Sequence, residues 1–356
     1  MFDLTTLTLN KEEVQEVSKA VFEYVLETSD IAKLHDIHTG IQWDTQIPFI
    51  GALGLVGREI EQCQPVTNTN KIPMSEKTWT PKLIGGRFEH CEVDIDPLFK
   101  LFGKVKRINP DYYDKIDSEE LGVVLMRIID SLKLMIPRIV WFGDTTVQEV
   151  QSGGYLTDGT DTYFFSMLDG LWKQIFADIP TTSKYYVEIT ENAGADYNAQ
   201  LDLPADFAFN LFRDMYAKAD PRFKQLMQSG KVTPMIHCTA AIAENWQAYK
   251  ETQSLHFTLS NVEGGGLQEM FRNIKIETRY DWDSIIQSYQ DDGTTYNLPN
   301  RALMTVPSNI PIGTVSTDDL TKVESFYDRY HEVNVMDFRL MLDAKFLSDY
   351  LAVAAY

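Results

Sequence analysis

Histidines and acidic pairs are the residues whose types and spacing could support metal binding or catalysis. His35 and His38 lie three residues apart with Asp36 between them, which permits a metal ion on one face of a helix. A third ligand, such as His90, is not placed by the sequence, and a catalytic zinc usually needs three protein ligands. We therefore predict solvent-facing histidines and no metal site.

Two aspartate pairs could supply the paired carboxylates of glycoside hydrolysis or of a cation site: Asp94 with Asp96, and Asp281 with Asp283. On a strand, residues two apart share one face, so both pairs are geometrically possible. The chain has 52 acidic residues, however, so such pairs are expected by chance. Gly-x-Ser-x-Gly and His-Glu-x-x-His are absent, and we predict no catalytic residues.

Two glycine-rich segments could in principle hold a nucleotide. Residues 51–57 have the spacing G-x-x-G-x-x-G, which differs from the dinucleotide fingerprint and lacks its framing strand, helix and distal carboxylate. Residues 264–266 have no following Lys-Ser/Thr, which excludes a Walker loop and favours a flexible turn. We predict no bound cofactor. Three widely spaced cysteines, Cys63, Cys91 and Cys238, indicate isolated thiols rather than disulfides or a cysteine-based zinc site.

The net charge of −20 bears on the possible partners. Proteins that bind phosphates use Lys/Arg contacts, and this chain presents the opposite field, so direct nucleic-acid binding is not expected. The tryptophans lack the basic neighbours of a base-stacking platform, so we interpret them as core or interface anchors. They are Trp43, Trp79, Trp141, Trp172, Trp246 and Trp282.

Length and hydropathy indicate a chain of two or three compact units. The 356 residues are 44% hydrophobic, which excludes a mostly disordered protein. No run of about 18 uncharged apolar residues occurs, and the first five residues lack the features of a signal peptide. We therefore expect a soluble protein made in a cytosol.

The elements that would position these residues begin with an amphipathic helix capped by Asn10 and Glu13. Residues 47–104 contain many Pro and Gly residues between strand-like pieces such as 77–80 and 87–93, which predicts a long exposed hairpin. Residues 117–143 form the clearest helix, with a broad apolar stripe that ends in Trp-Phe-Gly-Asp.

The central segment alternates helices and strands and predicts an α+β unit. Helices are expected over 204–219 and 222–229, and strands over 184–190, 232–239 and 274–280. Asp292-Gly293 is a hairpin-turn signal.

The C-terminal segment predicts a long strand with one packed and one solvated face. It follows Asn-Ile-Pro-Ile-Gly-Thr at residues 309–314. The residues expected on the packed face are Met336, Phe338, Leu340, Leu342, Ala344 and Phe346. Those expected on the solvated face are Asp337, Arg339, Asp343 and Lys345.

This order of segments, from about Ile47 to the end, resembles the major capsid proteins of tailed bacteriophages, the Hong Kong 97 fold. The resemblance rests on the Pro/Gly-rich hairpin, the helix that ends at residues 141–144, the mixed central unit and the 309–314 turn before the C-terminal strands. It implies an N-terminal arm and an extended loop, a peripheral domain in two parts, and an axial domain around the local five- and six-fold axes. Their bounds are 1–46 for the arm, 47–104 for the loop, 105–154 and 299–356 for the peripheral domain, and 155–298 for the axial domain.

The resemblance implies a non-enzymatic shell subunit that assembles into hexamers and pentamers around double-stranded DNA, without sequence-specific binding. Scaffolding, portal and decoration proteins would be its partners, and the virion its location after synthesis in the bacterial cytoplasm. In some relatives a lysine forms a covalent bond to a neighbour, but the sequence selects none of Lys71, Lys77 and Lys82. Because the arm begins almost at Met1, we expect a separate scaffold protein or none. Two alternatives stay open: an encapsulin-like nanocompartment, and a cytosolic enzyme with its site in residues 155–298.

Overall fold

The computed structural model describes residues 33–42, 45–50, 74–91, 134–252, 260–261, 267–315, 324–328, 330 and 333–356. The expected N-terminal helix, the glycines at 51–57 and 264–266, Asp94 and Asp96 lie outside these residues. Within the described part of the chain, no helix has both the length and the apolar character needed to span a membrane.

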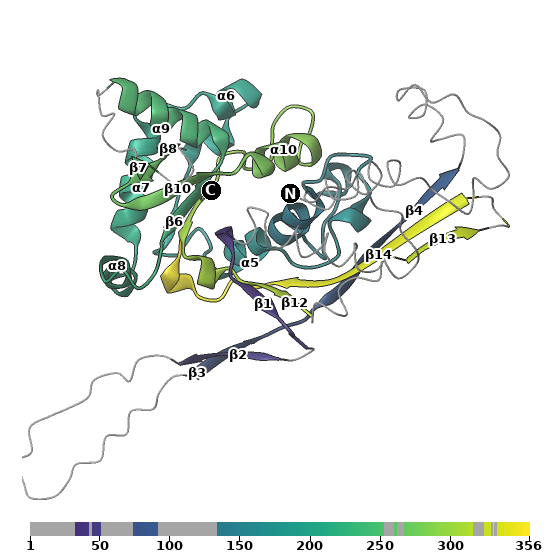
Figure 1. Ribbon diagram of the computed structural model, residues 1–356. Coiled ribbons are helices and arrows are strands. Elements are labelled where there is room, and N and C mark those ends of the chain that lie inside the picture. The colour runs from purple at the N-terminus through teal and green to yellow at the C-terminus, as the bar shows by residue number, and fades with distance from the viewer. Residues whose placement is uncertain are drawn as a thin grey trace, which may run out of the picture.

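A mixed six-stranded sheet forms the centre of one half of the molecule (Figure 1). Its strands, in spatial order, are β5 (Tyr186–Val187), β15 (Val353–Ala355), β11 (Ala302–Thr305), β6 (Met235–Cys238), β10 (Ile274–Thr278) and β9 (Met270–Phe271). β15 pairs antiparallel with β11 and parallel with β5, so the last strand of the chain lies inside the sheet. β11 and β15 thus join a sheet whose other strands come from residues 155–298.

Helices surround this sheet and bury its apolar side chains. They are α6 (Tyr197–Leu201), α7 (Phe207–Lys218), α8 (Pro221–Gln228) and α9 (Ala240–Thr252). Phe212 on α7 and Trp246 on α9 meet with ring centroids 5.7 Å apart, and both contact Phe271 of β9. The helices expected over 204–219 and 222–229 are confirmed, as is the strand that begins at Ile274.

The second sheet has five strands and is organised by the long strand β14 (Val333–Ala344). β4 (Lys82–Cys91) pairs along one edge of β14, while β12 (Ile312–Thr314) and β13 (Glu324–Asp328) pair along the other. β1 (Ile37–Thr39) adds in parallel to β12. In Figure 1, β4, β13 and β14 form an extension that reaches away from the half that contains the six-stranded sheet and α6 to α9, the helical half.

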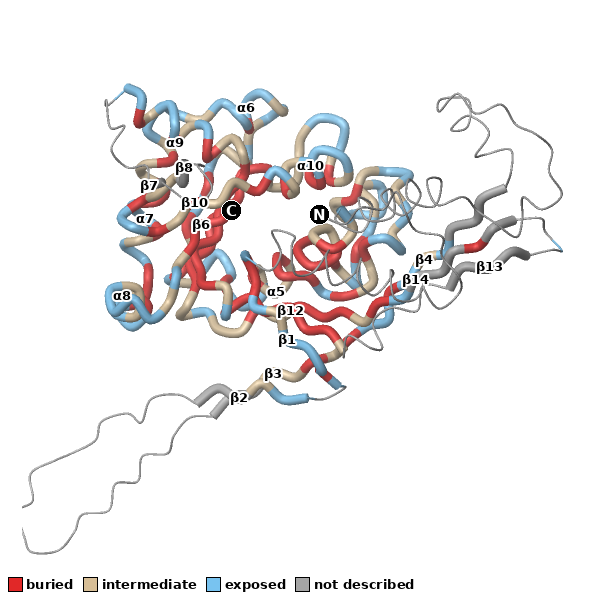
Figure 2. Tube along the Cα trace, viewed as in Figure 1, coloured by how far each residue is buried: buried red, intermediate tan, exposed pale blue. Residues whose placement is uncertain are grey.

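The period-two expectation for the C-terminal strand is confirmed at Leu340, Leu342 and Ala344, which are buried, and at Arg339, which is exposed (Figure 2). It is wrong at Asp343, which is only 2% exposed. Asp343 is buried because its carboxylate accepts a hydrogen bond from the Thr80 backbone N–H, which brings the chain just after β3 over this position.

The exposed hairpin begins at β2 (Gln46–Ile50), which pairs antiparallel with β3 (Met74–Thr78). Both strands project below the rest of the molecule in Figure 1. The strand-like pieces 77–80 and 87–93 were expected in this same hairpin, but residues 82–91 form β4 and pair with β14 instead. The hairpin is therefore shorter along the sequence than expected, because residues 82–91 pair with β14 along its edge from Val333 to Leu342.

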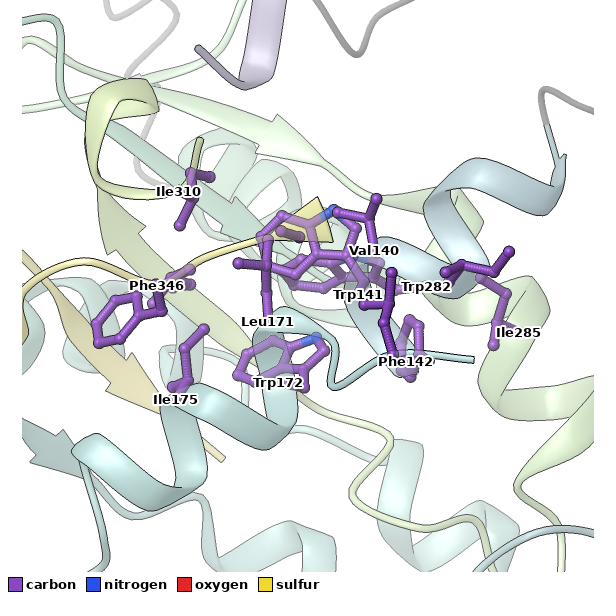
Figure 3. Packing of buried hydrophobic residues seen from close by; sticks show 14 of the residues in the cluster. Val140, Trp141, Phe142, Leu171, Trp172, Ile175, Trp282, Ile285, Ile310 and Phe346 are labelled. Atoms are coloured by element: carbon purple, nitrogen blue, oxygen red, sulfur yellow. The ribbon is translucent and has the colours of Figure 1, made fainter. Parts of the chain in front are cut away.

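Trp141, Trp172 and Trp282 form a cluster, the tryptophan joint, that connects the two halves of the molecule (Figure 3). Residues 134–142 are helical and end in Trp141 and Phe142, as predicted, although residues 117–133 lie outside the description. Trp141 packs against Trp172 of α5 (Leu171–Asp178) and Trp282 of α10 (Tyr280–Tyr289), with ring centroids 6.1 and 4.6 Å away. All three rings are buried, which confirms their interpretation as core anchors.

Candidate functional site

The two histidines considered for metal binding do not share a helical face. His35 precedes β1 and is buried, with Nδ1 2.8 Å from the Ile310 carbonyl oxygen. His38 lies within β1, is half exposed, and faces Asp36 at 3.6 Å. The expectation of a solvent-facing side chain is thus right for His38 and wrong for His35. His35 is buried because β1 pairs with β12 and brings it under the Trp141 ring.

Asp281 and Asp283 are in the first turn of α10, not on a strand. Asp281 pairs with Arg279, while Asp283 Oδ2 accepts a hydrogen bond from the Ala240 N–H at 2.8 Å. Burial raises the pKa of Asp283 to about 6. Each carboxylate is thus occupied by a partner within the chain. Among the described residues, no group of three His, Cys, Asp or Glu side chains could hold a metal ion.

The base of the projecting hairpin, at residues 77–80, is held against the rest of the molecule by specific side-chain contacts. Lys77 of β3 donates from Nζ to Asp178 Oδ2 and to the Phe346 carbonyl oxygen, each at 2.6 Å. Directly after β3, the Trp79 side chain is buried, with the residue 2% exposed, and the Trp79 backbone N–H donates to the Thr45 carbonyl oxygen at 3.0 Å. Lys77 therefore attaches the hairpin base to α5 and to the residues just after β14, while the Trp79 ring packs over β12.

Gly313 of β12 makes room for this anchor. A Cβ atom at position 313 would lie 2.7 Å from Ile41 and 2.7 Å from the Trp79 ring, closer than van der Waals contact allows. The glycine of the Ile-Gly-Thr segment is therefore required by the close packing of Trp79 over the sheet. Its role could not be seen from the sequence because Trp79 and Gly313 are far apart along the chain.

Asp343 also binds the residues at the base of the hairpin. Its Oδ2 accepts from the Thr80 N–H at 2.6 Å and lies 3.2 Å from Lys345 Nζ, and its Oδ1 accepts from the Ala344 N–H at 2.9 Å. Lys345 Nζ also donates to Thr80 Oγ1 at 3.0 Å. A buried carboxylate with these donors fixes the chain between β3 and β4 onto β14.

We expect Asp343→Asn to destabilise the folded chain by about 1.5–3 kcal/mol, because it weakens charged hydrogen bonds in a buried position. Asp178→Asn is the matched control, since its ion pair with Lys77 is partly exposed and should contribute at most about 1 kcal/mol. Urea unfolding of both variants checks the difference. Equal destabilisation by the two substitutions would contradict the role given to Asp343.

A pocket of about 590 Å³ lies beside the hairpin base. Its walls include Lys77, Lys82, Asp169 and Asp343. Asp169 is bound by Lys173 Nζ at 2.7 Å and by the Thr145 N–H and hydroxyl, and Asp343 is bound as described above. The Lys173 and Thr145 hydrogen bonds keep the pKa of Asp169 below its usual value, although burial opposes them. Both pocket carboxylates, Asp169 and Asp343, are thus already bound by hydrogen-bond donors within the chain.

Another residue that the sequence did not single out is Arg301, which is fully buried. Its guanidinium donates to the Leu298 and Asn297 carbonyl oxygens at 2.8 Å and lies over the Phe142, Trp172 and Phe176 rings. Desolvation lowers its pKa to about 9. Arg301 thus holds the loop after α10 against the tryptophan joint. No pattern of spacing identifies such a residue, because its partners are backbone carbonyls, aromatic rings and the amide oxygen of Gln290.

Comparison with solved structures identifies the fold. A chain of the satellite phage P4 procapsid, a structure that includes the size determination (Sid) protein, is similar with a TM-score of 0.51 and 10% identity, over 95% of this chain and 98% of that one. A chain of the Gordonia phage Cozz structure is similar with a TM-score of 0.51 and 11% identity, over 92% and 85%. No protein-family model and no curated protein matches the sequence. The chain therefore has the mixed helix-and-sheet fold found in phage capsid structures, and the resemblance inferred from the sequence is confirmed for the fold.

Proposed function

We propose that this chain is the major capsid protein of a tailed bacteriophage, a structural shell subunit and not an enzyme. The observation that carries the proposal is the likeness in fold to the phage P4 procapsid chain along 95% of the sequence. The paired state of Asp169, Asp281, Asp283 and Asp343 is consistent with it, because each carboxylate is used inside the chain.

The domains would have the roles that they have in the Hong Kong 97 fold. Residues 155–298, together with β11 and β15, would form the axial domain, which closes hexameric and pentameric rings. Residues 105–154 and the remainder of 299–356 would form the peripheral domain. The hairpin that runs from β2 to β3, residues 46–78, and the arm that precedes it would bind neighbouring subunits. Each contact can be weak because every subunit makes several, and closure of the shell multiplies their effect.

The charge of the chain fits a container for DNA. A net charge of −20 would let a shell enclose double-stranded DNA without adhering to it. Scaffolding, portal and decoration proteins would be further partners, and the subunit would be made in the host cytoplasm before entering the virion.

The hairpin provides the test. We expect a variant in which residues 51–73 are replaced by a two-residue turn to fold but not to form shells, because the strands β2 and β3 and their anchor are kept while the rest of the hairpin is removed. Negative-stain microscopy and light-scattering chromatography measure assembly, and circular dichroism measures folding. The control keeps the full hairpin and carries Asp178→Asn. Shells formed by the shortened variant would count against the proposal that the hairpin binds neighbouring subunits.

A further inference from the structure

Cationic side chains gather at one end of the helical half, around the C-terminus of α7 and along α8. They are Lys184, Lys218, Arg222, Lys224 and Arg272. Lys224 Nζ and the Arg272 guanidinium both lie over the Tyr216 ring, at 5.4 and 4.8 Å, and Lys218 Nζ donates to the Tyr186 carbonyl oxygen. These contacts, with the ion pairs that Lys184 and Arg222 share with Asp220, place the five cations on one region of the surface.

This basic end has few acidic side chains to neutralise it. Asp220 pairs with Arg222 at 3.0 Å and with Lys184 at 3.9 Å, but it is itself only 7% exposed, whereas Lys184 and Arg222 are 74% and 59% exposed. Asp214, on α7 one turn before Lys218, pairs with Arg213 at 3.5 Å, and Glu188 and Asp349 are the other acids that belong to the neighbouring segments. In a chain with 52 acidic and 32 basic residues, such a local excess of cations is the reverse of the overall balance.

Carboxylates gather at the other end, around α6, the N-terminus of α7 and the loop after α10. They are Glu191, Asp196, Asp202, Asp206, Asp291 and Asp292. Tyr197 of α6 donates from its hydroxyl to Asp291 at 2.6 Å, and Gln200 donates to the Tyr296 carbonyl oxygen at 2.9 Å, which joins α6 to that loop. Residues 190–206 and 291–297 contain no lysine or arginine.

Helix α7 separates the two ends. It begins directly after Asp206 and ends at Lys218, which corresponds to a length of about 18 Å. In Figure 1, α6 and α8 lie toward opposite ends of this half with α7 between them, and Figure 2 shows exposed residues on both. The two charged surfaces can therefore be used at the same time by two different neighbours.

We propose that the acidic end of one copy of this chain binds the basic end of the next, so that copies associate head to tail through the helical half. This inference rests on the proposed function and names one surface through which the shell subunits recognise each other. Two different patches on one subunit make a heterologous contact, and such contacts generate closed rings when the rotation between copies closes. Charge complementarity of this kind sets the partner, its orientation and the rate of association.

The inference explains why like charges are kept together at each end. Repulsion among neighbouring carboxylates, or among neighbouring cations, opposes folding of the isolated subunit. A second copy supplies the opposite charges, and the repulsion is then replaced by attraction across the contact. Because the groups are exposed, the association should weaken steeply as salt is added.

Charge reversal at each end tests the contact. The basic-end variant carries Lys218→Glu and Lys224→Glu, whose present hydrogen bonds go to carbonyl oxygens at the surface. The acidic-end variant carries Asp202→Lys and Asp206→Lys. Each variant alone should lose assembly by at least about tenfold at low salt, and a chain with all four substitutions, whose net charge equals that of the wild type, should recover it. The matched control is Lys33→Glu with Arg339→Glu, which changes the net charge as the basic-end variant does.

The mixed experiment separates this inference from the proposed function. If labelled basic-end and acidic-end variants associate with each other more tightly than either does with itself, measured by sedimentation velocity, the contact is supported even if no shells form. The inference is overturned if folded single-end variants assemble like the wild type, or if the mixture and the four-substitution chain show no recovery. If the wild type forms shells and either of those results is obtained, the proposed capsid function is retained and only this contact is rejected.

Discussion

Replacing Trp141 with alanine is expected to destabilise the folded chain by about 3–5 kcal/mol. The side chain is fully buried, and its ring contacts Trp172, Trp282 and His237, with the Arg279 guanidinium 4.9 Å from its centroid. Alanine would leave a cavity at the joint and remove the aromatic face that stabilises the buried guanidinium. Thermal and urea unfolding measure the loss.

Tyr163→Ala is the matched control for Trp141→Ala, because it also removes a large aromatic side chain but from a position that is 79% exposed. We expect the control to change stability by no more than about 0.5 kcal/mol. A Trp141→Ala variant as stable as this control would contradict the central place given to the tryptophan joint.

Mild acid is expected to destabilise the chain through two buried histidines. Burial lowers the pKa of His35 to about 3, with a further contribution from Arg279, and it holds the pKa of His237 well below its usual value. Neither ring nitrogen of His237 has a hydrogen-bond partner, and its ring contacts Trp141 and Trp282. Protonation would place a cation between aromatic rings and beside Arg279 and Lys275, which also act to lower its pKa.

The sign and size of the pH effect follow from these shifts. A histidine whose pKa is lowered by folding contributes stability above its unfolded pKa of about 6.5, and each pH unit below that value costs about 1.4 kcal/mol per histidine. Asp283 acts in the opposite direction, because its pKa of about 6 lets the folded chain take up a proton first as the pH falls. The net loss between pH 7 and pH 5 is therefore about 2–3 kcal/mol.

Urea unfolding at pH 7 and pH 5 measures this loss. We expect His237→Phe to reduce the pH dependence by about half of the histidine contribution. A pH dependence that is the same in the wild type and in His237→Phe would contradict the assignment to the buried ring.

Local elements could be predicted from the sequence because their signals are local. The apolar stripe of α7, the stop of α8 before Gly230 and the alternation in β10 each depend on neighbours within one or two turns or strands. The overall resemblance to phage capsid proteins could be recognised for the same reason, since it rests on the order of such elements.

Long-range contacts could not be predicted. Asp343 lies in a pattern typical of a solvated face, yet Thr80 covers it, and His35 was expected to face solvent, yet pairing of β1 with β12 buries it. Asp281 and Asp283 alternate as on a strand but occupy the first turn of a helix, where acidic side chains interact favourably with the helix dipole. For Asp343 and His35 the deciding partner comes from a distant part of the sequence.

The position of β15 has a consequence for biosynthesis. This strand lies between β5 and β11, so the six-stranded sheet contains a gap until residues 353–355 have left the ribosome. β14, which pairs with the much earlier β4, also emerges late. A nascent chain that stops short of β14 and β15 therefore cannot complete either sheet.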